Sequence, residues 1–263
     1  MIDSIVIYAY SGLLKMKGII MRPPRIAISG AIYHITTRCN NEQFSFQQEK
    51  DFTLYLEVLA KAKKKYDAKI HAYCITNNHV HLLIETPEKN NISQFMQYLN
   101  GNYSKKYNRL HTKTGHFWGE RFHSTIIDSD HYFMNALLYI EMNMARAKAV
   151  ADPKDWKWSS YRSHAFGEYD SILDLHPLYD ELGSTPEERQ RNYQEMMYGE
   201  MESKHLSSNT NLTNGLIIGS ESFVKSILKA MESLHPFYRE RKVYQYQQDF
   251  FLRISRKKSF LYQ

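Results

Sequence analysis

The sequence has only two cysteines, Cys39 and Cys74, among its 263 residues. Two thiols can form neither a disulfide framework nor a four-thiolate zinc site. We therefore expect both to be free thiols in a reducing cytosol. The sequence also has no apolar run that approaches the length of a membrane span, so we expect no membrane partner.

The first 20 residues lack the features of a secretory signal. Asp3 comes early, no basic segment precedes the apolar residues, and no small-residue cleavage site follows them. Met16 and Met21 are alternative starts. We expect residues 1–20 to be a leader, either disordered or an over-extended start.

Positive charge and aromatic side chains are abundant. The formal net charge is +6, the isoelectric point is about 9.0, and the chain holds 20 Tyr and 13 Phe. Such a charge favours a polyanionic partner, above all nucleic acid, although many proteins without such a partner carry it too. Part of the aromatic set must build the core, and a surplus beside Lys and Arg suits stacking on single-stranded bases.

The pattern of apolar residues predicts an α+β fold. It predicts strands over 31–39, 69–76, 79–86 and 116–128, and helices over 46–66, 91–110 and from Asp128 or Asp130 to Val150. The first six elements follow the βαββαβ order of a ferredoxin-like domain with an antiparallel sheet. The seventh element is an additional helix.

The stretch NNHVHLLIE, residues 77–85, places two histidines in a predicted strand. Because the side chains of a strand alternate between faces, His79 and His81 share one face and Val80 lies on the other. Neighbouring imidazoles that stay neutral can share a ligand. The triplet also arises by chance in a chain with 12 histidines, so its meaning depends on what else converges on it.

The additional helix carries two stripes. One is apolar and is expected to face the core: Phe133, Leu137, Ile140, Met144 and Ala147. The other is polar: Asn135, Tyr139, Asn143 and Arg146. Tyr139 and Asn143 are four residues apart and project together. A Tyr-x-x-x-Asn pair is nearly expected by chance among 20 tyrosines, so the spacing alone does not make the helix catalytic.

Together, the histidines and the polar stripe predict a metal centre beside a nucleophile. Two neutral imidazoles and the Asn143 oxygen would form half of an octahedral shell, which suits Mg²⁺ or Mn²⁺. A metal there would polarise a phosphodiester. The phenol of Tyr139, one helical turn from Asn143, would then attack the phosphate and form a phosphotyrosine that can be rejoined to another strand.

At these residues the sequence resembles a known family. NNHVHLLIE resembles the HUH motif, two histidines around a hydrophobic residue. The stretches LNGNYSKKYNRLHTKTGHFWGERFHSTIID and LLYIEMNMARAKAV, followed by WKWSSY, resemble the REP-associated tyrosine transposases, which are single-tyrosine HUH enzymes. The resemblance covers roughly residues 21–165 and continues more weakly beyond them. Each block alone is unspecific, whereas their joint occurrence in this order is specific.

The resemblance implies a role for each matched residue. His79 and His81 match the metal-binding histidines, Tyr139 matches the nucleophile, and Asn143 matches the third metal ligand. The implied substrate is single-stranded DNA, often beside a palindromic hairpin, and the implied intermediate is a 5′-phosphotyrosine. The implied location is the bacterial cytoplasm, in association with the nucleoid. Met144 stands where the family usually has proline, and methionine should let the helix continue smoothly, which would shift Asn143.

The expected organisation has three parts: a leader (1–20), an HUH catalytic domain (21–164) with its nucleophile-bearing helix, and an α-rich C-terminal accessory region (165–263). The basic, aromatic end of the last part, Arg239 to Phe260, is expected either to grip a DNA hairpin or to be disordered. Related small transposases exchange the nucleophile-bearing helix within a dimer and others act as monomers, so a monomer and a homodimer both remain open.

Five basic residues are candidates for contacts with DNA phosphates: Arg38, Lys105, Arg109, Arg121 and Arg146. A solvated surface position would explain Arg146 equally well and Lys105 and Arg109 better, and Arg121 could instead cap a sheet edge. Two other functions also remain open. One is a domesticated protein that binds hairpin DNA without productive cleavage, and the other is a metal-dependent nuclease that uses water.

Overall fold

The structure is a computed structural model. It describes residues 5–8, 14–16, 19–21, 27–28, 30–87, 91–128, 131–203, 212 and 215–234. The chain divides into two compact units, Met1–Gly219 and Ser220–Gln263. The expected basic tail, Arg239 to Phe260, lies outside the described residues.

The described strands are β1 (Ile5–Tyr8), β2 (Leu14–Met16), β3 (Ile19–Met21), β4 (Ile32–Arg38), β5 (Lys69–Ile75), β6 (His79–Glu85), β7 (His123–Ile127) and β8 (Gly215–Gly219). The described α-helices are α1 (Glu49–Tyr66), α2 (Ile92–Leu110), α3 (His131–Glu141), α4 (Asn143–Arg146), α5 (Tyr161–Phe166), α6 (Pro177–Asp180), α7 (Pro186–Ser203) and α9 (Glu221–Leu234). Two 3₁₀ turns are η1 (Asn40–Glu42) and η2 (Pro153–Asp155).

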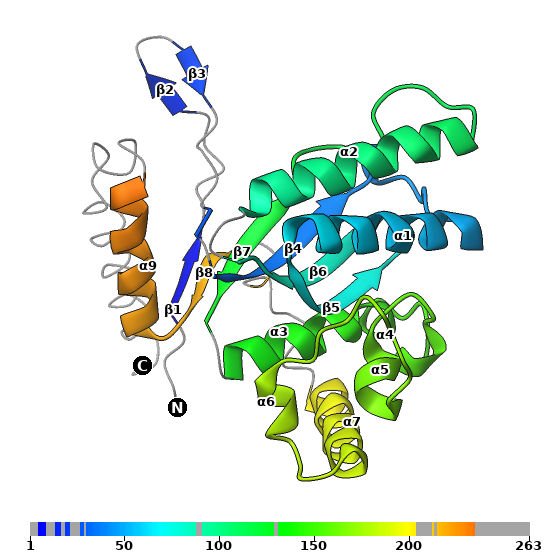
Figure 1. Ribbon diagram of the computed structural model, residues 1–263, viewed down its shortest axis with the longest axis vertical. Helices are drawn as coiled ribbons and strands as arrows, with labels where there is room; N and C mark the ends of the chain where they lie inside the picture. The colour runs from blue at the N-terminus through cyan, green and yellow to red at the C-terminus, as the bar shows by residue number, and fades with distance from the viewer. Residues whose placement is uncertain are drawn as a thin grey trace, which may run out of the picture. The chain divides into compact units, whose positions relative to one another are not determined.

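The central sheet confirms the expected ferredoxin-like domain. Its strand order is β1-β8-β7-β4-β6-β5, and the four strands β7-β4-β6-β5 pair antiparallel in the order of that fold (Figure 1). Helices α1 and α2 cover one face of this sheet, and α3 covers the other (Figure 1). The additional helix therefore packs on the face that the βαββαβ order leaves open.

Two strands extend the sheet beyond the predicted domain. Strand β8 pairs parallel to β7, with Ile217 opposite Ile126, and β1 pairs antiparallel to β8. The sequence predicts an α-rich region around β8 and a leader around β1, so neither strand was expected. Helices α5 to α7 belong to the same compact unit as the sheet.

Strand register decides which side chains share the face covered by α3. Thr36 of β4 lies directly opposite His81 of β6, and Arg38 lies opposite His79. Directly opposite residues in an antiparallel pair project to the same side. The face toward α3 therefore collects the even-numbered residues of β4 and both histidines of β6.

Much of the aromatic surplus lies in the core. The ring of Phe46 stacks on Tyr103 of α2 at 5.3 Å and meets Tyr55 of α1 edge-on at 5.8 Å. The ring of Phe52 stacks on Trp158 at 4.6 Å, which ties the segment after η2 to α1. These side chains are therefore not free to serve as base platforms.

The strand expected over 116–128 begins only at His123. The preceding segment crosses the end of β4, where the Asn40 amide donates to the Phe117 carbonyl at 2.8 Å and the Gly119 amide donates to the Arg38 carbonyl at 3.1 Å. A Cβ on Gly119 would lie 3.2 Å from the Cys39 carbonyl oxygen, so this crossing favours glycine. Arg121 consequently lies before the last strand of the domain, not on it.

The additional helix is shorter than expected and is interrupted. It was expected to run to Val150, but α3 ends at Glu141, Met142 forms a turn, and α4 ends at Arg146. The absence of the family's proline does not make this helix continuous. Ala147, expected on the apolar stripe, is exposed just after α4.

Candidate active site

His79 and His81 lie side by side on the face of β6 that α3 covers. Their ring centroids are 4.8 Å apart and their planes are nearly perpendicular, at 83°. Burial lowers the pKa of His79 to about 4, helped by the nearby positive charges of Arg38 and Arg146. Burial also lowers the pKa of His81 well below its ordinary value. Both imidazoles are therefore neutral at pH 7, as metal ligation requires.

A third histidine, His34 of β4, sets the tautomer of His81. His34 Nδ1 lies 2.7 Å from the Leu212 carbonyl oxygen, which can only accept, so this nitrogen carries the proton. The neutral ring then accepts at Nε2, which lies 2.8 Å from His81 Nδ1. His81 Nδ1 therefore donates, and the lone pair of His81 is left on Nε2.

His79 is held in the same tautomer by its own hairpin turn. Its Nδ1 lies 2.6 Å from Asn78 Oδ1 and 2.9 Å from Thr76 Oγ1. The Thr76 hydroxyl already donates to the His79 carbonyl oxygen, so it accepts from the ring. The lone pair of His79 is therefore on Nε2 as well. Metal-binding histidines are typically oriented by such a bond at the other ring nitrogen.

Asn143 closes the site from α4. Its side-chain nitrogen lies 3.0 Å from His81 Nε2, and its amide also hydrogen-bonds His79, an interaction that raises the pKa of that ring. The residue is buried, as is Met144 beside it. The expectation that Met144 would shift Asn143 is not what the structure shows, because Asn143 contacts both imidazoles.

Tyr139 lies beside the same histidines and belongs to the same chain. Its ring centroid is 6.0 Å from that of His81 and 5.8 Å from that of His34. The Arg146 guanidinium carbon lies 3.8 Å from the centre of the Tyr139 ring, so it covers one ring face. Only 5% of Tyr139 is exposed.

The donor set suits a divalent cation. Two Nε2 lone pairs and one carboxamide converge, and a carboxamide that turns over presents its oxygen instead of its nitrogen. Such mixed nitrogen and oxygen ligands suit Mn²⁺ or Mg²⁺ better than a metal that prefers thiolate ligands. In the described part of the chain, no group of three or more His, Cys, Asp or Glu could hold a metal ion. The third donor predicted from the sequence is the Asn143 carboxamide.

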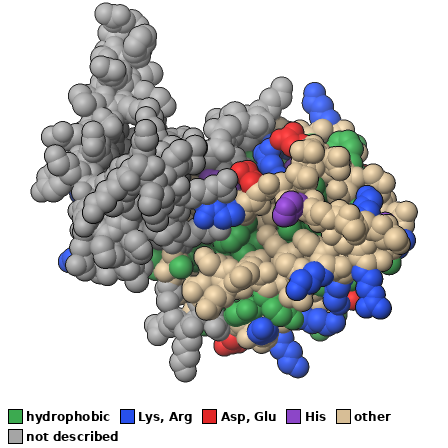
Figure 2. Space-filling view, turned by 90° about the horizontal axis from the view of Figure 1, so that it is seen from above, with side chains coloured by type: hydrophobic (Ala, Val, Ile, Leu, Met, Phe, Trp, Pro, Cys, Tyr) green, Lys and Arg blue, Asp and Glu red, His purple; other side chains and the backbone are tan. Residues whose placement is uncertain are grey.

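The five basic candidates do not gather at one place. Arg38 lies on the histidine face and pairs with Glu42 at 3.2 Å, and Arg146 covers Tyr139. Lys105 and Arg109 are exposed on α2, in the layer on the other side of the sheet from α3, and Arg121 is exposed before β7. Lysine and arginine side chains are spread over several places on the surface seen from the α2 side (Figure 2).

Sequence reasoning missed the supporting role of His34 and Thr36. The alternation of side chains in β4 places both on the face of Arg38, a signal that was available. Thr36 Oγ1 lies 3.2 Å from His81 Nδ1. Their contact with His81 depends on the register between β4 and β6, which the sequence does not specify. None of the helices in the described part of the chain could span a membrane.

Comparison with known proteins agrees with the expected family. A model of the family described as "Transposase IS200 like" matches residues 27–143. A Haemophilus influenzae protein named "Putative REP-associated tyrosine transposase" is 27% identical over 146 residues, which are 50% of this chain and 80% of that protein. A solved structure described as "Structure of the REP associates tyrosine transposase bound to a REP hairpin" gives a TM-score of 0.49 at 18% identity, over 59% of this chain and 92% of that one. The family match ends at Asn143 and so includes Tyr139 and both histidines.

Proposed function

We propose that the protein is a transposase of the family described as "Transposase IS200 like", whose model matches residues 27–143, and that it cuts and rejoins single-stranded DNA through Tyr139. The observation that carries the proposal is the convergence of Tyr139, Asn143 and the two Nε2 lone pairs in one chain. The relative's name ties that protein to REP elements, and the family resemblance implies a substrate at or near a palindromic hairpin, which we adopt in the proposal.

In the proposed reaction the Tyr139 oxygen loses its proton and bonds to the scissile phosphorus. The bond from phosphorus to the 3′ oxygen breaks, and the leaving 3′ oxygen takes up a proton. The product is a 5′-phosphotyrosine, which a second 3′-hydroxyl can attack to restore a phosphodiester. A Mg²⁺ or Mn²⁺ ion held by His79, His81 and Asn143 would polarise the phosphate.

The chain's own residues prepare this step. His34 and Thr36 keep the lone pair of His81 on Nε2, and the Thr76–Asn78 turn does the same for His79. Because Arg146 covers one face of the Tyr139 ring, its guanidinium must move for a phosphate to approach from that side. A guanidinium suits phosphate recognition, so we assign Arg146 to the DNA strand.

The remaining basic candidates are proposed as phosphate contacts away from the reacting atoms. Arg38 is the nearest of them to the histidines, on whose face it lies. Arg121, Lys105 and Arg109 are exposed and would follow the DNA outside the site. Their separate positions suit a substrate that runs past more than one side of the domain.

The test uses a DNA hairpin with a single-stranded flank, labelled at its 3′ end, together with Mn²⁺. The labelled fragment should migrate with the protein on a denaturing gel, because the 5′ end of that fragment is linked to tyrosine. Tyr139→Phe should abolish this band and leave DNA affinity within about twofold, since only the nucleophilic oxygen is lost. Tyr107→Phe, the same change on α2, is the matched control.

Two outcomes would replace the proposal with another function. Cutting that persists in Tyr139→Phe without a protein-linked band would indicate a nuclease that uses water. Hairpin binding by the wild type without any cutting would indicate a binding protein. Replacing both His79 and His81 by alanine should stop cutting in either enzyme and spare binding.

A further inference from the structure

A buried carboxylate stands at the end of α3, between the proposed nucleophile and the proposed third ligand. Glu141 is two residues after Tyr139 and two before Asn143, and only 1% of it is exposed. Successive residues of a helix are about 100° apart, so Glu141 projects about 200° away from Tyr139. It points away from the imidazoles and plays no part in the proposed reaction.

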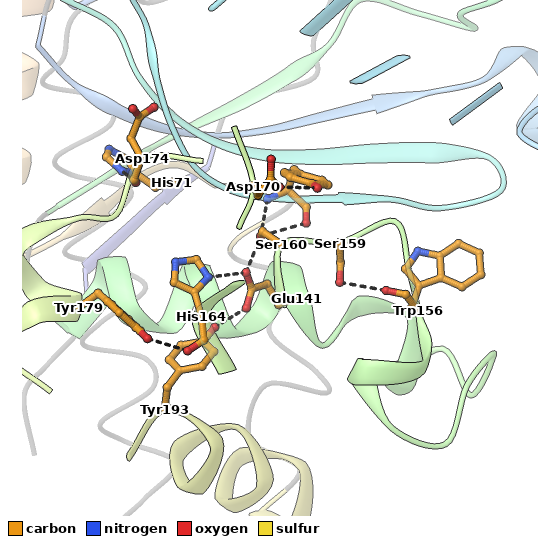
Figure 3. A network of polar contacts seen from close by, with 11 residues as sticks. His71, Glu141, Trp156, Ser159, Ser160, His164, Asp170, Asp174, Tyr179 and Tyr193 are labelled. Carbon is orange, nitrogen blue, oxygen red and sulfur yellow. Dashed lines mark hydrogen bonds and ion pairs between the residues drawn. The ribbon is translucent and has the colours of Figure 1, made fainter. Parts of the chain in front are cut away.

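Three donors surround this carboxylate (Figure 3). The Tyr193 hydroxyl of α7 donates to Oε2 at 2.6 Å, and His164 Nδ1 of α5 lies 2.8 Å from Oε1. The Ser160 hydroxyl also donates to Oε1. Each of these partners is at most 1% exposed. Both carboxylate oxygens are therefore satisfied by donors from outside α3.

The same partners tie the end of α3 to the rest of its compact unit. The Ser160 amide donates to the Tyr73 carbonyl of β5 at 3.0 Å, and the Tyr73 amide donates to Ser160 Oγ at 2.9 Å. The Tyr179 hydroxyl of α6 donates to the His164 carbonyl at 2.6 Å. One carboxylate thus connects α3 with β5 and with three helices that follow the family-matched segment.

The position of this network coincides with the interruption of the helix. Glu141 is the last residue of α3, Met142 forms the turn, and Asn143 begins α4. Backbone bonds cross this junction, because the Met142 amide donates to the Leu138 carbonyl at 2.9 Å and the Arg146 amide donates to the Met142 carbonyl at 2.8 Å. The contacts of Glu141 add to these bonds from outside the helix. A buried carboxylate with three donors has strict geometry, because any donor left without its acceptor pays the full cost of desolvation.

We propose that Glu141 is a positioning residue. Held by Ser160, His164 and Tyr193, it fixes the junction between α3 and α4, so that Tyr139 and Asn143 face the imidazoles together. The region after residue 143 thereby becomes part of the active site's support. The effect on DNA chemistry rests on the proposed function, whereas the effect on the junction does not.

The test compares two tyrosine-to-phenylalanine changes that each remove one buried hydroxyl. Tyr193→Phe removes a donor to Glu141, whereas Tyr103→Phe removes a hydroxyl of α2 that donates to the Asp51 carbonyl at 3.3 Å. Both tyrosines are 0% exposed. Ser160→Ala and Glu141→Gln are further variants, so that one unfolded protein does not decide the outcome.

Two measurements are made on each folded variant. In the free protein, hydrogen exchange of backbone amides 139–146 should become about tenfold faster in Tyr193→Phe than in Tyr103→Phe, because a local tie is lost. With saturating DNA and Mn²⁺, the rate of adduct formation should fall about tenfold, while the dissociation constant for DNA stays within about twofold. If Glu141 only stabilised the fold, Tyr193→Phe would lower the melting temperature but would not slow adduct formation at an unchanged dissociation constant for DNA.

The proposal is overturned if Tyr193→Phe and Ser160→Ala match Tyr103→Phe in the exchange of amides 139–146. It is also overturned if exchange accelerates while the adduct forms at the wild-type rate. If the wild type forms no adduct, the proposed function fails, and the exchange of amides 139–146 alone decides whether Glu141 holds the junction.

Discussion

Asp152, just before the short η2 turn, shows how one side chain joins distant parts of the chain. Its Oδ1 accepts from the Lys154 amide at 2.9 Å, and its Oδ2 accepts from the Tyr198 hydroxyl of α7 at 2.9 Å. Partial burial raises the pKa of this carboxyl, but the hydrogen bonds from Lys154 and Tyr198 outweigh it, so the net pKa is lowered. The ionised form is therefore the one that stabilises the fold.

At the residue scale we predict that Asp152→Asn costs about 1 kcal/mol at pH 7, because the hydrogen bonds from Lys154 and Tyr198 are stronger to an ionised acceptor than to a neutral amide oxygen. Because the folded pKa is below the ordinary value of 3.8, this contribution is present above pH 3.8 and is lost as the pH falls through the folded pKa. Urea unfolding at several pH values should show the two proteins converging in acid. Asp155→Asn, at an exposed neighbour, should change stability little at any pH.

At the scale of elements, α1 and α2 are joined at the start of α1. Asp51 Oδ2 accepts from the Gln48 amide at 2.9 Å, and Oδ1 lies 2.6 Å from His111 Nε2 at the end of α2. The carboxylate is 0% exposed. It therefore caps one helix and holds the end of the next, in the layer opposite α3.

We expect Asp51→Ala to lower the free energy of unfolding by about 3 kcal/mol, because it removes a cap and leaves His111 without its carboxylate partner. Urea unfolding followed by circular dichroism would measure the change. Glu57→Ala removes an exposed acid of the same helix and should stay within about 0.5 kcal/mol. Equal losses in both variants would mean that the Asp51 contacts contribute nothing specific.

At the scale of the whole molecule, the proposed catalytic residues come from one chain. The Tyr139 ring lies 6.0 Å from the ring of His81 in the same chain, and Glu141 ties its helix to β5 and α7 of that chain. This arrangement needs no helix from a second copy.

Mixing therefore tests where Tyr139 acts. A mixture of Tyr139→Phe and His81→Ala chains should form no protein–DNA adduct, because neither chain holds a complete site. Adduct formation by the mixture would show that chains exchange this helix. A wild-type sample diluted with His81→Ala protein serves as the control and should keep its activity per wild-type chain.

The sequence by itself determined the βαββαβ order, because alternating and helical apolar patterns are local properties of the chain. It also placed His79 and His81 on one face, and Tyr139 with Asn143 on one helix side, through the same periodicities. The sequence did not predict the break after Glu141 or strand β8. The break has no proline or glycine beside it, and β8 is a strand of only five residues, Gly215–Gly219.

Only the tertiary structure decided which of these residues meet. The contact between His34 and His81 depends on the register of β4 against β6, and the approach of Asn143 depends on how α3 packs on the sheet. The three donors around Glu141 lie 19, 23 and 52 residues after it in the chain. Such contacts follow from packing the whole unit at once, because no local pattern records the partner of a side chain that the fold brings in from a distance.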